Sequence, residues 1–99
     1  MNLTSAELER LALLAEEAAE IVQLVSKIIR FGKDSYHPND PSETSNIELL
    51  EMECSHIFVA IHLLAQEDDI NALKLNDHFD KKVTSINKFL KYNKVIPIE

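Results

Sequence analysis

The chain has very few of the residues that interrupt helices or cross-link a fold. Its 99 residues include one glycine, three prolines, one cysteine and no tryptophan. So few breakers, with few β-branched runs typical of strands, favour an all-α chain. A single cysteine excludes an intramolecular disulfide and a zinc site built from cysteines. Cys54 falls within a helical pattern, and we expect it to be a small buried apolar residue.

Positive charge is also scarce. Ten lysines and arginines stand against 17 aspartates and glutamates, which gives a formal charge of −7. Nucleic-acid polymers and anionic membrane surfaces require basic patches, so neither is expected as a partner. An anionic ligand would need a divalent metal between it and this acidic protein. The absence of a basic leader and of any long apolar run predicts no membrane association and a cytoplasmic location.

The length and the apolar fraction of 45% indicate one folded domain over residues 1–99. Thr4-x-x-Glu7 is a capping box that opens a helix to about Arg30, and Gly32 suits the position after a helix end. A polar loop follows over residues 33–45. Ser45-x-x-Glu48 is a second capping box, which opens a helix over residues 46–66.

The last third of the chain predicts a short turn or helix over residues 70–75 and a final helix to about Tyr92. Asn76 or Asp77 would cap that helix, and residues 93–99 form a tail. The expected fold is therefore an all-α bundle of three main helices plus a short one, with its core within residues 5–92. The apolar side chains expected to face inward from the final helix are Phe79, Val83, Ile86 and Leu90.

The first helix has little polar surface, because apolar residues occupy well over half of its circumference. Such a helix must be covered on more than one side. A small three-helix monomer cannot supply that cover. The pattern therefore predicts a subunit interface, in a homodimer or in a homotetramer formed as a dimer of dimers.

Acidic residues interrupt this apolar helix at its centre. At about 100° per residue, Glu17 and Glu20 share a stripe with Leu13 and Leu24, and Glu16 lies beside it. Carboxylates among apolar side chains are costly unless a cation or hydrogen-bond donors compensate them. The pattern therefore predicts a positive group at this face.

The second helix repeats the arrangement. Glu53 lies on a stripe with Leu49 and Leu64, and His56 follows one turn later. Mg²⁺ prefers oxygen ligands in octahedral geometry, so two such faces predict a shared cation site. The alternative is that Glu16 and Glu17 are solvated while Glu20 pairs with Lys27. The spacing of the glutamates alone fits this alternative about as well as it fits a metal site. The second cluster, Glu53 and His56, favours the metal site.

These motifs resemble those of a known family. Glu16-Glu17-Ala18-Ala19-Glu20 is similar to the Glu-Glu-x-x-Glu motif of the all-α nucleoside triphosphate pyrophosphohydrolases, the MazG-like superfamily. Glu53-Cys54-Ser55-His56 lies where that family carries Glu-x-x-Asp on its next helix. Together with the segment Ser26–Gly32, Pro38 and Asn46, the pattern is similar to small members often found in phages and bacteria. The resemblance covers roughly residues 5–92.

The resemblance implies hydrolysis of a nucleoside or deoxynucleoside triphosphate to its monophosphate and pyrophosphate. It implies Mg²⁺, with Mn²⁺ possible, held by Glu17, Glu20 and Glu53 with His56 assisting. Glu16 would be a further ligand or would orient the attacking water. The departure is His56, which replaces an aspartate and suits Mn²⁺ or Zn²⁺ better than Mg²⁺. A working site, a site with fewer metals, and a degenerate homo-oligomer that binds nucleotides or a protein partner all stay open, as does a bundle with no ligand.

Other polar residues are weaker candidates for substrate binding. Lys27 and Arg30 lie near the end of the first helix, where they could meet phosphates or simply complement the helix dipole. Asn46 could cap the second helix or contact substrate. Lys82 belongs to the basic last helix, which could face triphosphate across a subunit boundary or be a solvated face. Tyr36 and His37 could contact a base or sugar, and ordinary loop chemistry explains them equally well.

Overall fold

The computed structural model describes residues 2–98, which form three helices and no strand. The helices are α1 (Ser5–Phe31), α2 (Asn46–Gln66) and α3 (Ala72–Ile86). The all-α prediction is confirmed. No helix within residues 2–98 combines the length and apolar character needed to cross a membrane.

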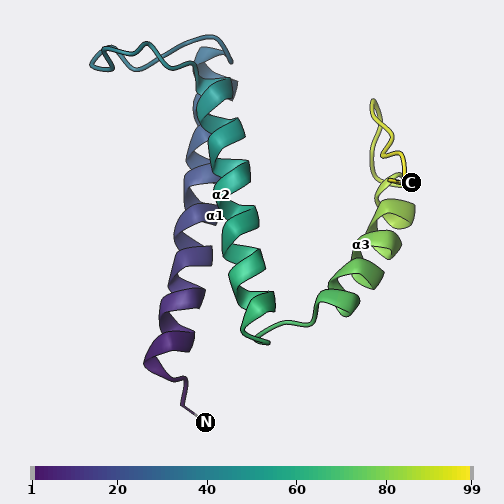
Figure 1. Cartoon of the computed structure of the whole chain (residues 1–99). Coiled ribbons are helices and arrows are strands. Elements are labelled where there is room, and N and C mark those ends of the chain that lie inside the picture. Colours follow the sequence, from purple (N-terminus) through teal and green to yellow (C-terminus); the bar gives the residue numbers. More distant parts are fainter. Residues whose placement is uncertain (1, 99) are drawn as a thin grey trace.

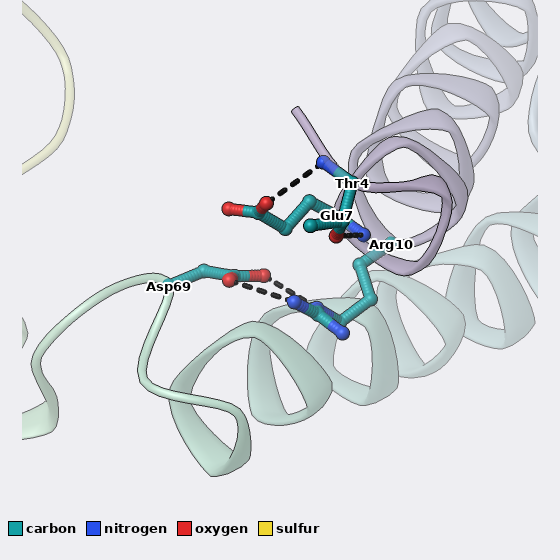
Figure 2. Close-up of polar contacts among 4 residues, drawn as sticks. All are labelled: Thr4, Glu7, Arg10 and Asp69. Carbon is teal, nitrogen blue, oxygen red and sulfur yellow. Dashed lines mark hydrogen bonds and ion pairs between the residues drawn. The ribbon is translucent and has the colours of Figure 1, made fainter. Parts of the chain in front are cut away.

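α1 and α2 form an antiparallel hairpin, and they are the one pair of helices in the described chain that pack extensively on each other (Figure 1). The predicted capping box opens α1: the Thr4 hydroxyl accepts a hydrogen bond from the Glu7 amide at 3.1 Å, and the Glu7 carboxylate accepts one from the Thr4 amide at 2.9 Å (Figure 2). Gly32 ends the helix with φ 91°, a conformation that side-chain-bearing residues rarely adopt.

α2 begins where predicted, but only one of the two hydrogen bonds of the predicted Ser45–Glu48 capping box is formed in the described chain. The Ser45 hydroxyl accepts a hydrogen bond from the Glu48 amide at 3.2 Å. Asn46 then ties the loop to the hairpin, because its side-chain amide donates to the Gly32 carbonyl at 3.1 Å and its backbone N–H donates to the Ser35 carbonyl at 2.8 Å. These bonds fix where the chain leaves α1 and enters α2, and so they set the register of the two helices.

The prediction for the last third of the chain is wrong in its boundaries. Asn71 caps α3 by accepting a hydrogen bond from the Lys74 amide at 3.0 Å. The segment expected to form a separate short helix is therefore the first turn of α3. The helix ends at Ile86, well before Tyr92, because Asn87 bonds the backbone of Val95 in both directions, at 2.7 and 3.1 Å, and draws the tail back along α3.

The buried core is small and lies mainly between α1 and α2, where Leu24, Ala60 and Leu64 are buried. α3 stands apart from the hairpin (Figure 1). Of the side chains expected to face inward from it, Val83 is buried and Ile86 half-buried, whereas Phe79 and Leu90 are exposed. Cys54 is exposed as well. The expectations for Phe79, Leu90 and Cys54 are wrong for the single chain, because α3, the third helix of the described residues, does not cover the hairpin.

Candidate metal centre

The hairpin brings together three side chains with metal-ligating atoms. Each of Glu17, Glu53 and His56 offers one such atom, and these atoms all lie within 4.8 Å of one another. Glu17 comes from α1, and the other two lie one turn apart on α2. Antiparallel packing of α1 and α2 places the middle of one helix beside the middle of the other. Three of the four predicted metal ligands therefore converge, and Glu20 is not one of this group.

His56 lies beside both carboxylates. Its Nδ1 is 3.2 Å from Glu53 Oε1 and 3.6 Å from Glu17 Oε2. With a proton on Nδ1, the imidazole donates a hydrogen bond to Glu53, which leaves the lone pair of Nε2 free. The His56 side chain is 48% exposed, against 16% for Glu17 and 11% for Glu53. The imidazole therefore forms the solvent-facing side of the cluster and the carboxylates form its floor.

Each carboxylate has one oxygen with no protein partner. Oε2 of Glu17 and Oε2 of Glu53 are both buried and make no hydrogen bond. Buried polar atoms are almost always paired, and an unpaired one loses its hydration without compensation. Two such oxygens beside an imidazole are the donor set that a divalent cation takes. The residues present therefore fit a metal ion.

The electrostatics of the cluster agree with this fit. The carboxylates of Glu17 and Glu20 accept a hydrogen bond from Glu53 only while Glu53 is protonated, and together with burial they raise the pKa of Glu53 to about 7. His56 acts in the opposite direction. The site therefore concentrates more negative charge than its own side chains can neutralise.

Glu20 lies at the next turn of α1 and adjoins the cluster through a cavity of about 240 Å³. Glu20, Glu53 and Lys27 all line this cavity. The ion pairs of the described chain do not include one between Glu20 and Lys27. The alternative in which that pair neutralises Glu20 is therefore not what the structure adopts. The rest of the lining is Gln23, Leu24, Leu49 and Met52.

A second cavity of about 290 Å³ adjoins the first, and Lys27 and Leu49 line both. Its lining includes aromatic residues from the end of α1 and from the loop that follows. Lys27 is the one lysine or arginine of the described chain in either lining. The remaining residues around the second cavity are Phe31, Ser35, Tyr36, His37, Pro38 and Asn46.

The other candidate site residues are more dispersed. Glu16 is exposed on α1 and is not one of the three converging groups. Arg30 lies outside both cavities, with its guanidinium 5.2 Å from the centre of the Phe31 ring. Asn46 lines the second cavity, and its side-chain amide nitrogen donates a hydrogen bond to the Gly32 carbonyl. Lys82 lies on α3, which stands apart from the two helices that carry the cluster (Figure 1).

Sequence reasoning missed part of the site. Met52 and Gln23 line the first cavity, and their helical spacing from Glu53 and Glu20 could have indicated it. Ser35 and Pro38 line the second cavity from an irregular loop, where no periodic signal exists. Comparisons of the chain with known protein families, with curated proteins and with solved structures give no match.

Proposed function

We propose that the protein is a metal-dependent nucleoside triphosphate pyrophosphohydrolase. The observation that carries this proposal is the convergence of Glu17, Glu53 and His56 from two helices, with two buried carboxylate oxygens left unpaired. A solvated acidic face would have no reason to bury these oxygens. The similarity of the two motifs to those of the MazG-like superfamily supports pyrophosphohydrolysis as the reaction of this cluster.

Glu17, Glu53 and His56 would hold the cation, and Glu20 adjoins it across the first cavity. A divalent ion bound there would neutralise the charge that develops on the phosphates and polarise the attacking water. Mg²⁺ is the proposed ion, as the resemblance implies. The imidazole of His56 adds affinity for Mn²⁺, because nitrogen ligands suit that ion better than Mg²⁺.

The adjoining cavities support a nucleotide as the substrate. Lys27 lines both the cavity that reaches Glu20 and Glu53 and the cavity lined by Phe31 and Tyr36. A phosphate chain near the cluster would meet Lys27, and a planar base beyond it would meet aromatic rings. This order of acid, cation and aromatic wall matches the order of groups along a metal-bound nucleoside triphosphate.

The proposed reaction is a simple hydrolysis. The oxygen of water forms a bond to the α-phosphorus, the bond from that phosphorus to the oxygen bridging to the β-phosphate breaks, and pyrophosphate leaves. The products are a nucleoside monophosphate and pyrophosphate, and the water protons pass to solvent. We assign Glu16, which is exposed beside Glu17, to orienting the water.

The test is pyrophosphate release from each ribo- and deoxyribonucleoside triphosphate with Mg²⁺ or Mn²⁺. We expect release by the wild type, a loss of at least 100-fold in Glu53→Gln, and unchanged activity in Glu51→Gln. Glu51 is the matched control, because it is exposed on the same helix and does not belong to the cluster. No release from any nucleotide with either ion, or equal rates in wild type and Glu53→Gln, would overturn the proposal.

A second candidate is a degenerate member that binds nucleotides or a protein without hydrolysing them. The observation that favours it is His56 itself, a half-exposed imidazole where the related motif has a carboxylate. His56→Asp separates the two candidates. An inactive wild type with an active His56→Asp variant identifies the degenerate protein.

We also infer that the chain works as a homo-oligomer, a dimer or a dimer of dimers. Along the hairpin, many large apolar side chains are exposed, and Val22, Ile29 and Phe58 are each at least 69% exposed. Exposed apolar surface of this extent is typical of an interface. Light scattering at micromolar concentration tests the inference, and a stable monomer contradicts it.

A further inference from the structure

Among the described residues, α3 makes no extensive contact with α1 or α2 of its own chain. We define the arm as residues 72–98, comprising α3 and the tail, and the hairpin as residues 5–66. In the described chain, α1 and α2 pack extensively on each other, whereas α3 extends away from both (Figure 1). An isolated 15-residue helix is marginal in water. The arm therefore needs a surface that its own hairpin does not provide.

The connection between hairpin and arm is held in place. Arg10, near the start of α1, forms two hydrogen bonds with the Asp69 carboxylate, at 2.5 and 2.9 Å (Figure 2). The Asp69 amide donates to the Leu64 carbonyl at 2.9 Å, and Asp68 takes a positive φ of 59°. These contacts fix the direction in which the chain leaves the hairpin, so that α3 points away from it.

The arm carries apolar side chains that lack cover. The tail folds back on α3 through Asn87 and Val95, yet Val83 is the one residue of the described arm that becomes buried. Its exposed apolar residues include Leu73, Phe79, Phe89 and Ile98. The hairpin presents a matching surface, with Leu8, Leu11, Val22 and Val25 exposed along α1 and Phe58 on α2.

Charge identifies the occupant of that surface. The hairpin has four basic and eleven acidic residues, a formal charge of −7, whereas the arm has six lysines and two aspartates, a charge of +4. Opposite charges on the two parts favour contact between them and disfavour contact of like parts. The arm extends away from its own hairpin. The hairpin of a second copy is therefore the surface that offers both apolar cover and opposite charge.

We propose that two copies of this chain exchange arms, each arm lying along the hairpin of the other. The exchange is reciprocal and closes with two-fold symmetry. An arm of 27 residues falls within the 20–30 residues a side of an ordinary stable interface. The lysines of the arm then lie against the acidic hairpin of the partner. This proposal does not depend on catalysis.

The test is zero-length cross-linking of the full wild-type chain. Equal amounts of ¹⁴N- and ¹⁵N-labelled protein are mixed, unfolded, refolded together and treated with a carbodiimide, which joins lysines to carboxylates in direct contact. We expect mixed-isotope peptides that link Lys81, Lys82 or Lys88 to glutamates of the hairpin. Arm–hairpin links that are all of one isotope, an oligomer with hairpin–hairpin links only, or a monomer by light scattering would overturn the proposal.

A charge variant gives an independent readout. Sedimentation equilibrium of Lys81→Glu/Lys88→Glu is compared with that of Arg30→Glu/Lys33→Glu, which changes the net charge equally but lies on the hairpin. We expect the dimer dissociation constant to rise at least tenfold in the arm variant and not to rise in the control, because the control makes the hairpin more acidic. Equal effects in the two variants would contradict arm exchange.

Discussion

Glu17 and Glu53, which lie 36 positions apart in the sequence on different helices, each direct one unpaired carboxylate oxygen into the same buried space. Their negative charges disfavour each other, and among residues 2–98 the imidazole of His56 is the one basic group that forms an ion pair with them. The arrangement is unfavourable for the metal-free protein at neutral pH and favourable once a cation binds. The free energy of unfolding should therefore fall as the pH rises towards 7 and should increase when a metal ion binds.

The first prediction concerns metal-free protein in EDTA. The pKa of Glu53 is about 7 in the folded chain against an ordinary value of 4.5. Because the folded state holds this proton more tightly, its contribution to stability is complete below about pH 4.5 and is lost as the pH rises towards 7. The free energy of unfolding should fall over this range, and Glu53→Gln should flatten the dependence and unfold at higher temperature than wild type at pH 8.

Urea titrations at several pH values measure this effect, with Glu51→Gln as the control that should follow wild type. Adding Mn²⁺ at pH 8 should then stabilise the wild type and leave Glu53→Gln unchanged, because binding to the folded state raises its stability. A Glu53→Gln variant with the same pH slope as wild type would remove Glu53 as the cause.

The second prediction concerns metal choice. His56 supplies a nitrogen ligand next to two carboxylates, so the wild type should bind Mn²⁺ at least tenfold more tightly than Mg²⁺. His56→Asp adds a hard oxygen ligand and one negative charge, which should bring the two affinities closer together. Calorimetric titration with each ion measures the ratio. His62→Asp, on an exposed position of α2, is the control, and an unchanged ratio in His56→Asp would exclude the imidazole from the site.

The hairpin and its acidic cluster could be predicted because their determinants are local. Thr4, Ser45 and Gly32 mark helix ends through bonds to neighbouring residues, and helical periodicity alone places Glu17 and Glu53 on facing stripes. The end of α3 could not be predicted in this way. It depends on Asn87 meeting Val95.

Two further features depend on where distant segments meet. Arg10 and Asp69 lie 59 positions apart, and no spacing rule pairs them. Cys54 follows the apolar periodicity of α2, which predicts a place in a core, yet it is exposed because α3 does not fold back over the hairpin. Periodicity identifies a face that needs cover, and the covering segment is decided by contacts that the pattern does not encode.

The third prediction tests the connection between the two cavities. Lys27 lines both cavities, so Lys27→Ala should weaken binding of a non-hydrolysable nucleoside triphosphate analogue by about tenfold, the loss of one charged contact. Metal binding without nucleotide should not weaken, because Lys27 is a cation and not a ligand. Lys33→Ala is the matched control, since Lys33 is exposed and lines neither cavity. Equal nucleotide affinity of wild type and Lys27→Ala would show that the phosphates of the bound nucleotide do not contact Lys27.

The fourth prediction concerns the Arg10–Asp69 pair. The Arg10 guanidinium lowers the pKa of Asp69, so the stabilising coupling is present above the ordinary pKa of aspartate and is lost as the pH falls through the depressed value. Arg10→Met and Asp69→Asn should each lower the midpoint of thermal unfolding by a few degrees at pH 7, and the double variant should lose little more than either.

The same three variants at pH 2–3 complete the cycle, because protonation of Asp69 should remove the difference between wild type and Arg10→Met. Arg30→Met controls for the loss of an α1 arginine, since Arg30 contacts the Phe31 ring and forms no ion pair in the described chain. Additive effects at pH 7 would mean that each residue acts through other contacts. The connection between hairpin and arm would then not be held by this pair. The direction in which α3 leaves the hairpin would depend on the backbone hydrogen bonds to Leu64 alone.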